Sequence, residues 1–202
     1  MNAADATAAL KAGFASAILE EKEFRGELSL TLRQESLREV CRHARDELGF
    51  DYLIDVSSVD HFGDEPRFEV VYELYSMNDG VHLRLRTAVS EDACELPTVS
   101  DLWPTANWHE REVFDLMGIR FKDHPDLRRI LMWEGYPYHP LRKDFPLEGK
   151  PSEVAGLAFS DVAPLAGGPF VTVPTDGTTQ VREPRARHAG TPPVTDKFIE
   201  EP

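Results

Sequence analysis

Charged and imidazole side chains are concentrated between residues 107 and 148, in two blocks separated by a stretch rich in aromatic residues. Carboxylates close to histidine are able to move protons or to hold a metal ion. Arginine and aromatic side chains set among mixed charges are, in contrast, typical of a polar protein interface. The candidate residues are Glu110, Arg111, Glu112, Asp115, His124, Arg128, Arg129, His139, Arg142, Lys143 and Asp144.

A metal site in this region would have to be built from His109, Glu112, Asp115 and His124. These residues form no His-Glu-x-x-His sequence and no paired-ligand spacing, so structural hydrogen bonding is the favoured role. A free-standing hydrolase that uses His124 with Asp126, or His109 with Asp115, remains an alternative. It predicts activity or bound metal in the isolated chain, where an interface predicts neither.

Other catalytic patterns have less support. Ser57, Asp60 and His61 are the residue types of a catalytic triad, but no Gly-x-Ser-x-Gly elbow accompanies them. Neither a Walker motif nor a Gly-x-Gly-x-x-Gly run occurs, so no nucleotide site is expected. The pairs Arg128-Arg129 and Arg142-Lys143 are able to clamp an anion, although acidic side chains of a protein partner suit them at least as well.

The first block requires a helix to position it. Residues 108–117 place Val113, Leu116 and Met117 on one side at helical spacing, with charged residues on the other. Arg111 and Asp115 are one turn apart and are predicted to pair. Gly118 is expected to end this helix.

The residues before this block predict a regular α+β body. Helical spacing predicts helices over 3–20 and 37–48, and alternating or β-branched residues predict strands over 28–32 and 52–59. The clearest local signal is a hairpin formed by 68–75 and 81–87 around Asn78-Asp79-Gly80. This order does not repeat a βα unit, so we expect an α+β fold with a mixed, largely antiparallel sheet and helices on one face.

Composition excludes several classes of function. The net charge of −14 disfavours a nucleic-acid surface, because phosphate binding needs clustered positive charge. Cys41 and Cys94 are the only cysteines, too few for a self-contained iron–sulfur cluster. No run approaches the ~18 apolar residues of a membrane span, and the first residues do not resemble a signal peptide. We therefore expect a cytoplasmic chain with no direct membrane span.

The last part of the chain has a different amino-acid composition. Eight prolines and six glycines fall within residues 149–202, where isolated apolar residues such as Phe159, Leu165 and Phe170 are also spread. Such a composition is near the limit at which chains stop forming packed domains. We predict an α+β domain over 1–148 and an extended, partner-binding C-terminal arm over 149–202, with a disordered tail as the alternative.

The two blocks resemble a known family, the C subunit of the proton-pumping NADH:quinone oxidoreductase, respiratory complex I. The first family block stands here as Glu110-Arg111-Glu112, Asp115, Leu116-Met117, His124, and Arg128 before Ile130-Leu131. The second, His-Pro-Leu-Arg-Lys-Asp-Phe-Pro, is complete at 139–146. One position departs from the family pattern, since Tyr138 stands where glycine is common, so the local turn is expected to differ.

This resemblance implies a non-catalytic structural subunit of the peripheral arm, on the cytoplasmic side of the bacterial inner membrane. The complex passes electrons from NADH through FMN and iron–sulfur clusters to quinone. The resemblance implies no cofactor in this chain, with FMN and clusters held by partner subunits, and contacts with the D subunit, which contributes the quinone site, and with the iron–sulfur subunits B and I. An equivalent subunit of an energy-converting hydrogenase or of a ferredoxin-driven quinone reductase would share both blocks and remains an alternative.

Overall fold

The computed structural model describes residues 2–147 of the 202-residue chain. Residues up to Asp144 form one compact unit, which contains all helices and strands of the described residues. The predicted C-terminal arm, 149–202, lies outside the described residues.

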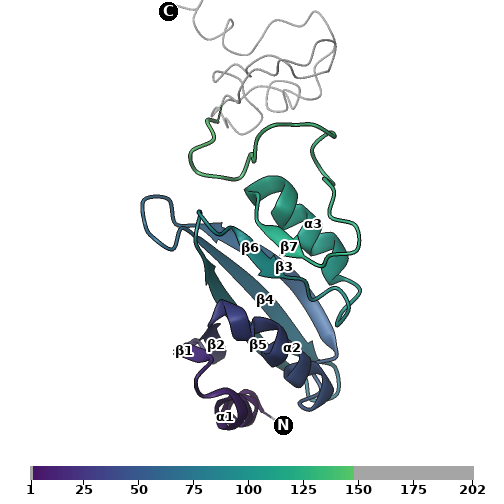
Figure 1. Ribbon diagram of the computed structural model, residues 1–202. Helices are drawn as coiled ribbons and strands as arrows, with labels where there is room; N and C mark the ends of the chain where they lie inside the picture. Colours follow the sequence, from purple (N-terminus) through teal and green to yellow (C-terminus); the bar gives the residue numbers. More distant parts are fainter. Residues whose placement is uncertain (1, 148–202) are drawn as a thin grey trace, which may run out of the picture. The chain divides into compact units, whose positions relative to one another are not determined.

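A five-stranded sheet forms the centre of this unit (Figure 1). Its strand order is β1-β2-β5-β4-β3; β2 and β5 run parallel and the other neighbours are antiparallel. The mixed, largely antiparallel sheet expected from the sequence is confirmed. The strands are β1 Ile18–Phe24, β2 Glu27–Leu32, β3 Tyr52–Asp60, β4 Phe68–Ser76 and β5 Val81–Val89. Two short strands, β6 Glu95–Pro97 and β7 Arg120–Lys122, form a separate parallel pair.

The predicted hairpin is β4 and β5. Alternate residues of both strands are buried, and Tyr72 lies opposite Leu85 in the register. Gly80 in the connecting turn has a φ of +67°, which explains the glycine in the Asn-Asp-Gly sequence. Because side chains alternate across a strand, this pattern gives the sheet one apolar face and one charged face.

Three helices contribute to the core on the apolar face of the sheet. They are α1 Ala3–Phe14, α2 Leu37–Asp46 and α3 Ala106–Met117, and a short 3-10 turn, η1 Gln34–Ser36, precedes α2. Leu10, Val40 and Val113, one from each helix, belong to the same cluster of buried residues as the inward side chains of the strands. The expected placement of helices on one face therefore agrees with the structure.

The first helix is shorter than its sequence pattern predicts. It ends at Phe14 rather than near residue 20, and Ile18 begins strand β1. After β1 the chain turns back through Arg25 and Gly26, both at positive φ. Strand β1 pairs with β2 from Ile18 to Phe24, with a register shift between Ile18 and Glu20. Backbone pairing with a neighbouring strand thus outweighs the local helical spacing. Helix α2 likewise ends at Asp46, before the predicted residue 48.

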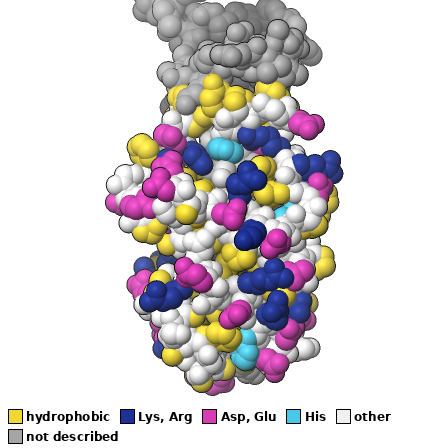
Figure 2. Space-filling model, in the orientation of Figure 1, with side chains coloured by type: hydrophobic (Ala, Val, Ile, Leu, Met, Phe, Trp, Pro, Cys, Tyr) yellow, Lys and Arg dark blue, Asp and Glu magenta, His cyan; other side chains and the backbone are white. Residues whose placement is uncertain are grey.

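The surface carries both signs of charge despite the acidic composition. Figure 2 shows basic and acidic side chains interspersed over the visible face of the described residues. No helix among the described residues is long and apolar enough to cross a membrane.

Candidate functional site

The first motif block lies on α3, and a glycine fixes its end. Gly118 has a φ of +78° and its backbone N–H donates to the carbonyl of Phe114 at 3.0 Å. A Cβ atom at this position would lie 2.6 Å from His139 Nε2 and 2.7 Å from Arg142 Nη2. The glycine therefore ends the helix and also lets the second motif block approach it closely.

Asp115 is the centre of the first block. Its side chain has no exposed surface, and its Oδ2 atom accepts hydrogen bonds of 2.7–3.0 Å from three consecutive backbone N–H groups, those of residues 130–132. Its Oδ1 atom accepts from Arg129 Nη1 at 2.6 Å. Burial acts to raise the pKa of Asp115, but the hydrogen bonds from Met132, Arg129 and their neighbours outweigh it and hold the pKa below its usual range. Asp115 is thus an ionised anchor for the segment that follows β7.

Arg111 acts on the same segment by a different route. Its Nε and Nη2 atoms donate to the backbone carbonyls of Arg128 and Arg129, each at 3.2 Å. The predicted pair between Arg111 and Asp115 is therefore replaced, since Asp115 binds Arg129 and Arg111 binds carbonyl oxygens. The Asp115 carboxylate accepts hydrogen bonds from backbone N–H groups, and the Arg111 guanidinium donates to backbone C=O groups. Together the two side chains satisfy both kinds of backbone group in an irregular segment.

Glu110 is buried as well, but it binds a different part of the chain from Asp115. One carboxylate oxygen accepts a hydrogen bond from the Thr98 hydroxyl, and the other accepts from the Val99 backbone N–H at 2.7 Å. Burial raises the pKa of Glu110 to about 7, although the bonds from Thr98 and Val99 act in the opposite direction. Glu110 connects α3 to the loop that follows β6.

His124 faces Glu110 but is held by backbone groups. Its Nδ1 atom accepts from the Asp126 backbone N–H at 3.0 Å, so the proton of the neutral ring is on Nε2, which donates to the Asn107 carbonyl at 3.2 Å. Burial lowers the pKa of His124, which favours this neutral form. The Nε2 atom lies 3.8 Å from the Glu110 carboxylate, too far for a hydrogen bond.

The second motif block binds the end of α3. His139 Nδ1 donates to the Asp115 carbonyl at 2.9 Å, and Arg142 Nε donates to the Met117 carbonyl at 2.7 Å. The Arg142 guanidinium also lies over the Phe68 ring, 5.0 Å from its centroid. Burial lowers the pKa of His139, so its neutral form is favoured. The two blocks, which residues 132–138 separate in the sequence, therefore form one site around the last turn of α3.

Arg67 joins this block to the sheet, and the sequence did not single it out. It is buried, binds both carboxylate oxygens of Asp60 at 2.9 and 3.0 Å, and donates to Asp144 at 2.8 Å. Asp60 in turn accepts from the Lys143 backbone N–H at 2.8 Å. The sequence does carry a signal for the Asp60–Arg67 pair. The two opposite charges stand at the two ends of the loop that joins two predicted strands, and antiparallel pairing of those strands brings these ends together.

The residue sets considered for catalysis do not come together. Asp60 binds Arg67 on the apolar face of the sheet, whereas Ser57 lies in the register opposite Val71 on the charged face, so no triad forms. His109 contacts Asp55 at 3.1 Å instead of Asp115. Among residues 2–147, no group of three or more His, Cys, Asp or Glu side chains is placed to hold a metal ion.

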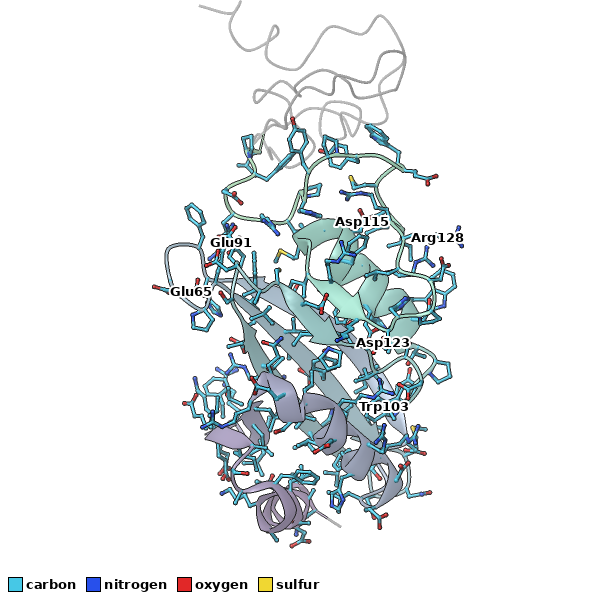
Figure 3. The ribbon with its side chains drawn as sticks, viewed as in Figure 1. Glu65, Glu91, Trp103, Asp115, Asp123 and Arg128 are labelled. Atoms are coloured by element: carbon cyan, nitrogen blue, oxygen red, sulfur yellow. The ribbon has the colours of Figure 1, made fainter. Side chains whose placement is uncertain are left out.

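Some of the predicted site residues remain at the surface. Figure 3 shows Asp115 on α3, and Arg128 on the segment that follows. The Arg128 side chain is 71% exposed and pairs with Asp126, and Glu112 and Lys143 are exposed as well. Three large hydrophobic side chains of the same region, Trp108, Leu131 and Leu141, are also exposed. The buried motif residues therefore build the segment, and the exposed residues are those available to a partner.

Comparison with known proteins places these blocks in a family. Residues 30–151 match the family model described as the 30 Kd subunit of respiratory-chain NADH dehydrogenase. The C subunit of the NADH-quinone oxidoreductase of Geotalea uraniireducens is 50% identical over 144 residues, which cover 71% of this chain and 88% of that protein. The protein of the same name from Roseiflexus sp. is 46% identical over 163 residues, 80% of this chain and 92% of its own.

Solved structures agree with the fold. A trypsin-resistant fragment of Nqo5 superposes with a TM-score of 0.55 at 37% identity, covering 60% of this chain and 98% of the fragment. A chain of an archaeal membrane-bound sulfane sulfur reductase shares the fold with a TM-score of 0.62 at 24% identity, over 71% of this chain and 85% of its own. The family model matches more than half of the chain, and the chain covers most of the length of these relatives. The chain therefore belongs to the family of the 30 Kd subunit of respiratory-chain NADH dehydrogenase.

Proposed function

We propose that the chain is a non-catalytic, structural subunit in the peripheral arm of a proton-translocating NADH:quinone oxidoreductase, in which electrons pass from NADH through FMN and iron–sulfur clusters to quinone. The observation that carries this proposal is how the motif side chains are used. Hydrogen bonds join the side chains of Asp115, Arg111 and His139 to backbone N–H and C=O groups of residues 115–132. A site of this kind shapes a protein surface, because its polar groups are engaged in holding the chain in place.

The electron carriers in this proposal belong to partner subunits. The chain itself has two cysteines, and Cys41 is buried, where burial raises the pKa of its thiol and disfavours the thiolate that binds metal. We propose that FMN and the iron–sulfur clusters are held by other chains, and that this chain packs beside the D subunit, which contributes the quinone site, and near the iron–sulfur subunits B and I. Its place is peripheral, on the cytoplasmic side of the bacterial inner membrane.

Exposed hydrophobic residues beside the motif blocks support a role in assembly. Trp108, Leu131 and Leu141 are 58–61% exposed, and each lies within or next to a motif block. Large apolar side chains surrounded by polar residues are typical of protein interfaces. Relatives named as NADH-quinone oxidoreductase subunits favour that complex over a hydrogenase or a ferredoxin-driven quinone reductase.

The proposal is tested by deleting the chain and restoring it in the cell that makes it. We expect membranes without the chain to lack assembled complex and NADH:quinone reductase activity, and the full chain supplied in trans to restore both. The purified chain is expected to contain neither flavin nor iron and to oxidise no NADH. Flavin, iron or hydrolase activity that copurifies with the isolated chain in constant proportion would refute the non-catalytic role.

A further inference from the structure

A narrow groove lies between α3 and β3, one of the two edge strands of the five-stranded sheet. Its volume is about 140 Å³, similar to cavities that hold a benzene-sized apolar group. Val113, Leu116 and Met117 of α3 supply apolar surface, and residues 55–58 of the edge strand form the opposite wall. The groove therefore has room for one aliphatic side chain beside the polar backbone of an edge strand.

An exposed leucine stands at the groove. Leu141 lines it and has 58% of its surface exposed. Its backbone N–H donates to the Leu116 carbonyl at 3.1 Å, so the residue is fixed in place while its side chain remains in contact with water. An exposed apolar side chain on a fixed backbone is typical of a preformed contact, because little conformational entropy is lost when a partner binds.

The charge at the groove is negative. Glu112 and Asp55 line it, and no lysine or arginine does. Arg111, the basic residue next to Glu112, donates instead to the carbonyls of Arg128 and Arg129. His109 lies 3.1 Å from Asp55 and is the basic group in contact with that carboxylate. The exposed Glu112 carboxylate forms no hydrogen bond or ion pair with another residue of the described part of the chain.

The charged face of the sheet offers a contrast. There Arg84 binds Glu73 and Glu27, and Arg86 binds Glu69. Charges that are already paired within the chain give a partner little to gain. The α3–β3 groove has an unpaired carboxylate next to exposed apolar surface. It is therefore better suited than the charged face of the sheet to bind another chain.

We propose that the α3–β3 groove receives an extended segment of another subunit, in which an aliphatic side chain fills the apolar floor and a lysine or arginine within two residues pairs with Glu112. This inference rests on the proposed function in one respect, that the partner belongs to the same complex. Trp108, one helical turn before Glu112 and 61% exposed, extends the contact surface along α3. Residues two apart in an extended chain face the same side, which suits a groove with acidic and apolar parts.

The first test reverses one charge in the full chain. The tagged Glu112→Lys variant is expressed in place of the wild type, and the complex is purified from gently solubilised membranes. We expect recovery of the other subunits to fall about tenfold or more, as for a close charge pair at an interface. Glu47→Lys is the matched control, because Glu47 is an exposed acid just beyond α2 and away from the groove. Unfolding free energies of both purified variants equal to that of the wild-type chain would show that folding is unaffected.

The second test identifies the occupant. A benzophenone amino acid at position 141 is photoactivated in the assembled complex, and the linked peptide is sequenced. We expect one peptide of another subunit, with Lys or Arg within two residues of an aliphatic residue, and a change of that basic residue to Glu should restore recovery of Glu112→Lys. Normal recovery with Glu112→Lys, or a linked peptide without a basic residue, overturns the groove proposal. A wild-type chain that recovers no subunits of the complex overturns the proposed function instead.

Discussion

Replacing Asp115 by asparagine should destabilise the chain strongly. The change removes the charge that faces Arg129 and puts an N–H₂ group where one carboxylate oxygen now accepts hydrogen bonds. Breaking a buried ion pair by neutralising one partner costs about 3–5 kcal/mol. The amide N–H₂ group also faces donors in either orientation, because it replaces the acceptor of Arg129 or that of the three backbone N–H groups. Because Arg129 keeps 16% of its side chain exposed, we expect a loss near the lower end, about 3 kcal/mol.

The assay is guanidinium unfolding of the full chain, followed by tryptophan fluorescence, with hydrogen exchange of the amides at 130–132 as the local measurement. Asp126→Asn is the matched control, since the Asp126–Arg128 pair is exposed and worth less than about 1 kcal/mol. The lowered pKa of Asp115 adds a pH dependence, because its stabilisation is complete above the ordinary aspartate pKa and is lost as the pH falls through the folded value. A loss within about 1 kcal/mol, with unchanged exchange at 130–132, would refute the anchor role of Asp115.

Two further changes test other parts of the site. Glu110 has its pKa raised from 4.5 to about 7, so wild-type stability should fall by about 3 kcal/mol as the pH rises between those values. Glu110→Gln should remove this fall, and unfolding free energies at pH 5 and pH 8 that change in parallel in both proteins would contradict the assignment. Gly118→Ala should lower stability by about 2 kcal/mol or more, because the left-handed backbone cost is joined by displacement of His139 and Arg142. Gly26→Ala, at a similar φ with nothing within 4 Å of the added Cβ, should cost only the backbone part, and equal losses in thermal melts would count against the close approach at Gly118.

The sheet was predictable where side-chain period and turn chemistry agree. The β4–β5 hairpin is a clear case, since its alternation and the Asn-Asp-Gly turn both predict the same register. Strand β1 was not predictable, because Leu10, Phe14 and Ile18 continue a helical spacing into a segment that pairs with β2. Pairing with a distant or neighbouring strand is tertiary information that a local pattern does not contain.

The candidate site was predictable in its residues but not in its bonds. The types and spacing of the two blocks identified the polar residues around α3, including Asp115 and His139. Their partners are mostly backbone groups, which every residue carries and which leave no sequence signal. The predicted Arg111–Asp115 pair was wrong because both side chains bind backbone groups of the segment after β7, which local spacing on the helix does not describe.

The contact between Arg67 and Asp60 could have been predicted by pairing the expected strands with one another. It lies just before β4, and Asp60 ends β3, so antiparallel pairing of these strands brings the two charges together. Through Asp144 the same arginine fixes the second motif block to the sheet. The block therefore depends on a residue more than 70 positions away, which its own sequence does not indicate.

The most direct test of the structural-subunit account is a pull-down of the tagged full chain from gently solubilised membranes, with mass spectrometry of the copurifying chains and an NADH:quinone reductase assay on the eluate. The account predicts recovery of flavin-binding, iron–sulfur and membrane subunits together with that activity, while the chain purified alone is inactive. Recovery of the chain by itself, with hydrolase activity or a bound metal of its own, would contradict the account.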